Sequence, residues 1–293
     1  MFSSPYRQGL LALVGLCIIP GLCAEKSGPA AYARFVPERK DDFAFENDKV
    51  AFRIYGPDLK DSAENSGIDC WLKRVDYPII DKWYSENAMG KSYHKDHGEG
   101  YDPYKVGSSL GCGGLALWID GKLVQSNVFQ GYRIKENGPS RVVFEIDYAW
   151  EDIEGDFTET RRFTLALGSQ LFKAESQIFS HGEPTPAKVA IGIATDGGQA
   201  MVSSKSTQNT VWISAWQSIH DAHLGTGAIL DKESYASTQI IDSDKSDRSH
   251  IALIANTDNE GRIVYHAGFA WSKAGEIVNL EDWIQYLNTF SEK

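Results

Sequence analysis

The sequence is poor in cysteine, and its long hydrophobic runs are confined to the N-terminus. Four of the 293 residues are cysteine, and only Cys70 and Cys112 lie beyond residue 24. This pair lacks the spacing of a zinc-binding motif, and the sequence leaves open whether it forms a disulfide or two buried thiols. No stretch beyond residue 24 is long and apolar enough for a membrane-spanning helix, so membrane insertion is not expected.

Positive charge is also scarce, with 29 lysine and arginine residues against 40 aspartate and glutamate residues and a net charge of −11. An acidic chain is poorly suited to bind nucleic acid, although a few local cations can still attract a small anionic ligand. A glycine-rich phosphate loop is missing as well. The segment GCGG at residues 111–114 has neither the spacing nor the strand–helix context of a nucleotide-binding loop, so no organic cofactor is expected.

The N-terminus has the parts of a secretory signal peptide. Arg7 precedes an apolar run at residues 10–19, and a short segment of mostly small residues ends at Ala24. The apolar run is too short to cross a membrane as a helix. We therefore expect residues 1–24 to be a signal peptide cleaved after Ala24, and the mature protein to be periplasmic or secreted.

Short runs of β-branched and aromatic residues, bounded by glycine, proline, asparagine or aspartate, dominate the sequence from residue 49 onward. Residues 141–148 (RVVFEIDY) alternate between apolar and polar, and residues 158–167 (TETRRFTLAL) end at a Gly-Ser turn. This pattern predicts an all-β sandwich or barrel, as one domain over residues 25–293, because no repeat or linker divides the chain. Only residues 280–290 have helical spacing, with Asn279 as the candidate N-cap.

Residues 61–114 hold little strand pattern and many polar residues, which is typical of a functional connection. Within them, residues 93–105 (YHKDHGEGYDPYK) carry histidines, acids, lysines and tyrosines but no aliphatic residue. A metal site, an acid–base site and a solvated loop pinned by histidine hydrogen bonds are the three interpretations of this composition.

A divalent metal bound by this segment would take His94, His97 and Glu99 as ligands, with Asp96 or Asp102 in addition. The glycines and the proline of the segment oppose a helix, so the two histidines do not share one helical face as in a helical zinc motif. The aspartates also lack the alternation of a calcium loop. These arguments favour the acid–base interpretation and leave the metal site as the alternative.

Five segments of the chain resemble a bacterial family catalogued as domain of unknown function 4861. They are ARFVPERKDDFAFEND (33–48), SGIDCWLKRV (66–75), YHKDHGEGYDPYK (93–105), GCGG (111–114) and YHAGFAWS (265–272). The resemblance implies a large antiparallel β-supersandwich of the galactose-mutarotase type with long loops. It also implies action on acidic plant or algal polysaccharides. One similar protein is a dehydratase of ulvan oligosaccharides, which removes water from the non-reducing-end uronic acid to give the 4,5-unsaturated sugar.

Such an elimination needs a cation to neutralise the uronate carboxylate, a base for the C5 proton and an acid for the departing hydroxide. His94 and His97 are the predicted bases, because imidazole titrates in the working range. Tyr101 is the third predicted catalytic residue, since Tyr93, Tyr101 and Tyr104 can each donate a proton, or accept one if a nearby cation lowers the pKa. Predicted substrate-binding residues supply cations, aromatic faces and further polar groups. They are Lys73, Arg74, Lys82, Lys105, Trp83, Tyr84, Glu99, His223 and His266.

The last two of these belong to a second histidine group, His220, His223 and His266, which lies late in the chain. In a supersandwich, strands that are distant in sequence line the same face, so one of these histidines can face the loop of residues 93–105. A histidine satisfied within the sheet explains His266 equally well.

Three other functions use the same residues. An endo-acting polysaccharide lyase needs the same base and neutraliser, but a sugar leaves instead of hydroxide. A glycoside hydrolase needs two carboxylates, for which Glu99 with Asp102, or Asp196, are available. A non-catalytic carbohydrate-binding β-sandwich needs only aromatic platforms. An acidic oligosaccharide is the expected partner, and the oligomeric state stays open.

Overall fold

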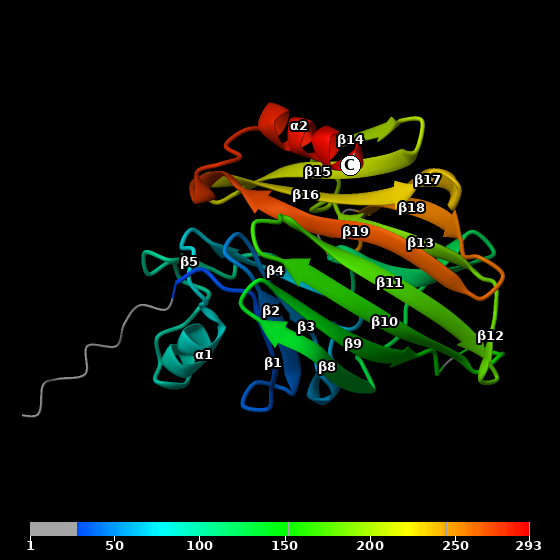
Figure 1. Cartoon of the computed structure of the whole chain (residues 1–293), viewed down its shortest axis with the longest axis horizontal. Helices are drawn as coiled ribbons and strands as arrows, with labels where there is room; N and C mark the ends of the chain where they lie inside the picture. The colour runs from blue at the N-terminus through cyan, green and yellow to red at the C-terminus, as the bar shows by residue number, and fades with distance from the viewer. Residues whose placement is uncertain (1–27, 152, 244, 246, 293) are drawn as a thin grey trace, which may run out of the picture.

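The structure is a computed structural model that describes residues 28–151, 153–243, 245 and 247–292. The expected signal peptide lies outside the described residues. Within them, antiparallel strands form three sheets, and the α-helices are two short ones, α1 (Ile80–Ala88) and α2 (Leu280–Ser291) (Figure 1). Neither described helix is long and apolar enough to cross a membrane. The predicted all-β sandwich with a C-terminal helix is confirmed.

The largest sheet has nine strands. In spatial order they are β14 (Met201–Ser206), β15 (Thr210–Ile219), β16 (Ala222–Asp231), β19 (Arg262–Trp271), β11 (Leu171–Ser180), β10 (Phe157–Ala166), β9 (Arg141–Ala149) and β8 (Gly131–Gly138), with β12 (Glu183–Pro184) paired to β11. Side chains along β10 alternate between buried and exposed, as expected for a sheet with one face in the core.

Two five-stranded sheets cover the inner face of this large sheet. The first contains β1 (Tyr32–Val36), β2 (Asp42–Glu46), β3 (Ala51–Ile54), β4 (Ile68–Lys73) and β5 (Gly100–Tyr101). The other contains β17 (Tyr235–Ile241), β18 (His250–Asn256), β13 (Lys188–Ala194), β6 (Cys112–Ile119) and β7 (Lys122–Val124). A parallel bridge between Ile68 and Gly111 links the two sheets. Figure 1 shows β1–β4 toward the left of the large sheet and β13, β17 and β18 toward the right.

One continuous hydrophobic core fills the sandwich. Phe45 and Phe52 of the first sheet stack on each other at 4.9 Å between ring centroids, and both meet Phe172 of the large sheet edge-on. Cys70 and Cys112 also lie in this core as free, buried thiols rather than as a disulfide. Burial raises the pKa of Cys70 well above its ordinary value, which keeps the thiol protonated.

Helix α2 covers the outer face of the large sheet where β14–β16 and β19 lie. Trp283 and Leu287 are fully buried against this face, and the side chain of Asn279 accepts a hydrogen bond of 2.9 Å from the backbone N–H of Asp282. The predicted helix and its N-cap are therefore confirmed.

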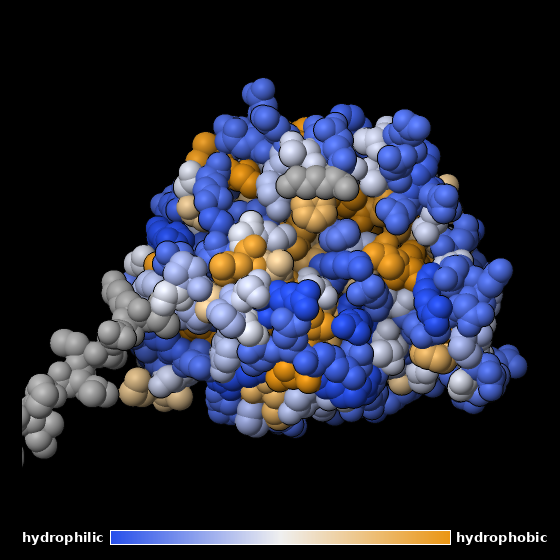
Figure 2. Space-filling model, viewed as in Figure 1, coloured by the Kyte–Doolittle hydropathy of each residue, from blue (hydrophilic) through white to orange (hydrophobic). Residues whose placement is uncertain are grey.

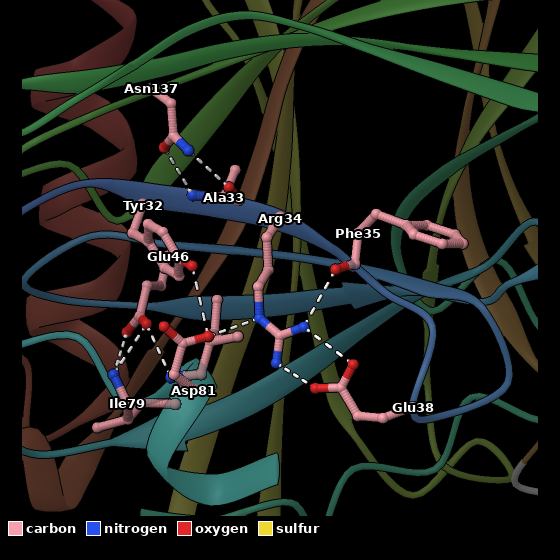
Figure 3. Close-up of polar contacts among 10 residues, drawn as sticks. Tyr32, Ala33, Arg34, Phe35, Glu38, Glu46, Ile79, Asp81 and Asn137 are labelled. Atoms are coloured by element: carbon pink, nitrogen blue, oxygen red, sulfur yellow. Dashed lines mark hydrogen bonds and ion pairs between the residues drawn. The ribbon is translucent and has the colours of Figure 1, made fainter. Parts of the chain in front are cut away.

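Helix α1 lies in the segment for which the sequence predicted little regular structure, and that prediction was wrong. No local side chain caps α1. Instead, the buried Glu46 of β2 accepts hydrogen bonds of 2.8–2.9 Å from the backbone N–H groups of Ile79 and Ile80 (Figure 3). Arg34 of β1 pairs with Asp81 in the first turn at 2.6 Å. The start of the helix is therefore stabilised by a distant strand, which a local pattern does not reveal.

Candidate active site

The side chains of β4 and β5 alternate between the two faces of the first sheet, and this alternation divides the predicted site residues into two groups. Trp71 and Lys73 face α1, whereas Cys70, Leu72 and Tyr101 belong to the core shared with the large sheet. The predicted residues therefore do not converge on a single pocket.

Lys73 lies on the α1 face and is fully buried. Its ammonium group donates to a carboxylate oxygen of Glu46 and to the backbone carbonyls of Asn47 and Tyr77, each at 2.8 Å. These three acceptors use all three ammonium hydrogens. This corrects the expectation that Lys73 binds a substrate carboxylate, because it has no donor left for one.

Glu99 also faces α1. Its carboxylate accepts hydrogen bonds from Lys82 at 2.6 Å, from the indole N–H of Trp83 at 3.2 Å and from the hydroxyl of Tyr77. Partial burial alone would raise the pKa of Glu99, but these donors outweigh burial and hold it below its ordinary value. Glu99 and Lys82 thus form a structural pair that attaches α1 to the start of β5.

The predicted aromatic platforms are interior side chains. Trp83 and Tyr84 are only 5% and 3% exposed, and their rings pack on Trp71 at 5.6 Å and 4.9 Å between centroids. Tyr93 completes this aromatic cluster under α1. This corrects the expectation that Trp83 and Tyr84 stack on a sugar ring, because neither ring presents a free face.

The two histidines of the loop bind to the loop itself. His94 places Nδ1 at 3.0 Å from the backbone carbonyl of Asp102, and His97 places Nε2 at 3.1 Å from that of Ser92. His94 Nδ1 also lies 3.4 Å from the carboxylate of Asp102, whose side chain points away from the face of Tyr101. His94 is therefore on the α1 side of the sheet. Among the described residues, no group of three His, Cys, Asp or Glu side chains is arranged to hold a metal ion.

Behind His94 lies a buried arginine among three aspartates. Arg53 lies 2.8 Å from Asp69, 3.6 Å from Asp102 and 4.0 Å from Asp42. Burial raises the pKa of Asp42 to about 6, and it raises those of Asp69 and Asp102 as well. Three acids around one cation thus favour retention of protons in the folded protein.

This cluster predicts a pH-dependent loss of stability. An unperturbed aspartate titrates near pH 3.8, whereas Asp42 in the folded protein titrates near 6, so the folded state binds more protons between these values. The stability that this proton contributes is complete below about pH 4 and is lost as the pH rises through 6. We expect Asp42→Asn to exceed the wild type in free energy of unfolding above pH 6, by about 3 kcal/mol.

Urea unfolding at pH values below and above 6 measures this difference. The exposed Asp58→Asn serves as the matched control and should track the wild type. An unchanged pH profile in Asp42→Asn would show that Asp42 keeps an ordinary affinity for protons.

On the other face of the first sheet, Tyr101 meets a histidine from the large sheet. Its hydroxyl lies 2.9 Å from Nδ1 of His220, in the turn between β15 and β16, and the two rings stack at 5.5 Å between centroids. The ring of Trp271, at the end of β19, lies 5.9 Å from that of Tyr101. Figure 1 shows β5 beside the left ends of β16 and β19. These contacts bring together segments more than 100 residues apart.

Burial raises the pKa of Tyr101, and the nearby Asp221 raises it further, whereas the positive charge of Arg74 opposes both. The hydroxyl is therefore protonated at neutral pH, with a cation close enough to stabilise the phenolate. His220 was recognised in the sequence only as one of three late histidines and was not among the predicted site residues. No local signal distinguishes it, because its contact with Tyr101 depends on how the sheets stack.

Arg74 lies beside this pair. Its guanidinium is 4.9 Å from the ring of Trp271, and it forms an ion pair with Asp96 of the loop. Its Nε has no hydrogen-bond partner among the described residues. Arg74 and Trp271 line a pocket of about 110 Å³ together with Lys49 and Gln170. Arg74, one of the cations predicted to bind substrate, therefore lies next to Tyr101 in the structure.

The two remaining late histidines occupy other positions. The exposed ring of His223 stacks on Trp216 at 5.7 Å. His266 faces outward from β19, and its ring meets Phe290 of α2 edge-on at 5.0 Å. Burial lowers the pKa of His266 to about 4. Figure 2 shows hydrophobic residues at the surface beside α2, in keeping with the pocket that Val264, His266 and Phe290 help to line. This corrects the expectation that His266 binds substrate near the loop.

Comparison with solved structures gives weak similarities. An α-galactosidase of Geobacillus stearothermophilus is 10% identical, with 83% of this chain aligned to 42% of that one at a TM-score of 0.37. An aldose 1-epimerase candidate of Klebsiella pneumoniae is 8% identical, with 89% of this chain aligned to 87% of that one at a TM-score of 0.38. The chain thus spans about two fifths of the galactosidase.

Sequence comparison gives a stronger match. "Uncharacterized protein P7" of Formosa agariphila is 36% identical over 273 residues, which cover 89% of this chain and 67% of that protein. The model of a family described as "Domain of unknown function (DUF4861)" matches residues 23–293. The match includes the loop of residues 93–105, β4, β5 and the turn that carries His220. The chain therefore belongs to the DUF4861 family.

Proposed function

We propose that this protein is a carbohydrate-processing enzyme that eliminates water from the non-reducing-end uronic acid of acidic oligosaccharides, such as ulvan fragments. The observation that supports this best is the hydrogen bond of 2.9 Å between Tyr101 and His220, beside a pocket lined by Arg74. Resemblance to the family supplies the substrate class. The reaction is redox-neutral and requires no organic cofactor. Its proposed location is the periplasm or the medium, in keeping with the signal-peptide pattern of residues 1–24.

In this proposal, Arg74 neutralises the carboxylate of the substrate. The C5 proton is very weakly acidic while the neighbouring carboxylate carries its full charge, so a positioned cation lowers the barrier to its removal. The guanidinium is held between the ring of Trp271 and the carboxylate of Asp96, which limits its motion. Preorganisation of this kind costs no rearrangement when charge develops on the enolate.

Tyr101 transfers protons in the proposed reaction. His220 takes the phenolic proton at Nδ1 as the phenolate removes the proton from C5. The re-formed hydroxyl then protonates the departing 4-hydroxyl, which leaves as water, and His220 returns its proton to Tyr101. The C5 proton thus leaves with the hydroxyl, and the pair ends in its starting state. The nearby charge of Arg74 stabilises the transient phenolate.

One assay tests the reaction class. The purified protein is incubated with saturated and with lyase-generated uronate oligosaccharides, with and without chelator, while enoate absorbance and product mass are followed. Loss of one water without chain cleavage supports the proposal. Chain shortening with an unsaturated end indicates an endo-acting lyase instead, a gain of water indicates a hydrolase, and binding without any product indicates a carbohydrate-binding module.

A pair of histidine variants tests the assignment of His220. We expect His220→Gln to lower the turnover rate about 100-fold, because glutamine cannot accept and return the phenolic proton. His223→Gln changes the neighbouring exposed histidine of the same hairpin and should stay within about threefold of the wild type. Steady-state rates on one uronate disaccharide measure both variants. Equal losses in the two variants, or a loss in His223→Gln alone, would contradict the assignment.

A further inference from the structure

A second pocket adjoins the Tyr101–His220 pair, with a volume of about 160 Å³. It is formed by three segments that are distant in sequence: the loop after β5, the segment after β13 and the last residues of β15. The polar side chains that line it are Lys105, Asp196, Gln217, Ser218 and His220. The proposed reaction uses only His220 of this set, so the other side chains are left without a role.

One buried polar atom of a lining side chain lacks a partner within the described protein. Gln217 lines the pocket and is only 9% exposed. Its Oε1 has no hydrogen-bond partner. Unpaired buried polar groups are costly and rare in folded proteins, so each needs an explanation. A ligand that brings a hydroxyl group to Gln217 would satisfy this oxygen.

The rim of the pocket carries one charge of each sign. Lys105 is exposed and has no ion-pair partner within the described ranges, and Asp196 is half-buried. Asp196 and His220 both adopt left-handed backbone conformations, with φ angles of 50° and 52°. A wall with a carboxylate and an amide oxygen accepts hydrogen bonds, which suits sugar hydroxyls better than an anionic group.

We propose that this pocket is the subsite for the second sugar of the substrate, the residue that carries the terminal uronic acid. Gln217 and Asp196 accept hydrogen bonds from its hydroxyls, and Lys105 donates to oxygens at the rim. The inference rests on the proposed function, because it takes the Tyr101–His220 pair as the position of the uronic acid. His220 lines the pocket and also forms the hydrogen bond with Tyr101, so the pocket adjoins the proposed position of the uronic acid. Two sugars that are joined by one glycosidic bond can therefore occupy the two neighbouring positions.

Binding measurements with two probes test the subsite. The probes are methyl glucuronoside, which has one ring, and an unsulfated disaccharide with glucuronic acid at its non-reducing end, which has two. We expect Gln217→Met to weaken binding of the disaccharide about tenfold and to leave binding of the one-ring probe unchanged. Asp196→Asn, at the rim, should act in the same direction. Gln239→Met changes an exposed glutamine of β17 and serves as the matched control.

Thermal unfolding separates a binding effect from misfolding. Gln217→Met removes an unpaired buried oxygen, so its unfolding midpoint should equal or exceed that of the wild type. The subsite is overturned if both variants bind the disaccharide as the wild type does, or if they weaken both probes equally.

The same data distinguish failure of the subsite from failure of the proposed function. Selective loss of disaccharide binding without any elimination by the wild type would retain the subsite and reject the dehydratase. Elimination by the wild type together with unchanged binding in both variants would reject the subsite alone.

Discussion

Tyr101→Phe is expected to lower the rate of water elimination about 1000-fold while substrate binding stays close to that of the wild type. The hydroxyl is the group that meets His220 at 2.9 Å, and phenylalanine removes it without changing the ring that packs against Trp271. Because the hydroxyl both removes and returns a proton in the proposed cycle, its loss affects each half of the reaction. The expected pattern is a fall in kcat with little change in KM.

Enoate absorbance measures the rate, and titration calorimetry with the same oligosaccharide measures binding. Tyr132→Phe, on the exposed surface of β8, is the matched control and should retain full activity. If Tyr101→Phe keeps more than about a tenth of the wild-type rate, proton transfer by Tyr101 is rejected, since general acid–base groups contribute at least about 100-fold. If Tyr101→Phe and Tyr132→Phe both lose activity, the cause is a general defect of the protein rather than the loss of a catalytic group.

Lys73→Met is expected to destabilise the protein by about 3–5 kcal/mol, because it leaves the carboxylate of Glu46 buried without its cation. Glu46 of β2 binds both Lys73 and the start of α1, so its uncompensated charge affects the attachment of the helix. Urea unfolding monitored by tryptophan fluorescence measures the loss. In buffer without urea, where Lys73→Met remains folded, its KM for the oligosaccharide should equal that of the wild type.

Two comparisons make this second prediction specific. Lys82→Met breaks the more exposed pair with Glu99 and should cost at most about 1 kcal/mol. The double variant Lys73→Met with Glu46→Leu removes both buried charges and should recover part of the stability that Lys73→Met loses. A raised KM with unchanged stability in Lys73→Met would instead restore Lys73 as the substrate ligand that the sequence predicted.

The sequence alone was sufficient wherever the determinant is local. The alternation in β9 and β10 follows from one buried face and one exposed face, so a period of two predicts the sheet directly. The start of α2 is likewise determined locally, because the side chain of Asn279 accepts a hydrogen bond from a backbone N–H only three residues away. Those patterns determined the all-β class and the C-terminal helix. Composition also marked residues 93–105 as unusual, although it did not show which of their side chains meet.

Tertiary structure alone decided which of those side chains share a site. Lys73 and Arg74 are neighbours in the chain, yet one is buried against Glu46 and the other lies beside Trp271, because successive side chains point to opposite faces of a sheet. Strand β5 has only two residues, so no periodicity reveals where Tyr101 points.

The partner of Tyr101 depends on the same kind of long-range arrangement. His220 lies 119 residues further along the chain and reaches Tyr101 only because the large sheet packs across the end of the first. Likewise, the carboxylate that holds the start of α1 comes from Glu46, 34 residues earlier than Ile80. A contact between segments so far apart is decided by sheet stacking and strand register, and neither is encoded in a local window of sequence.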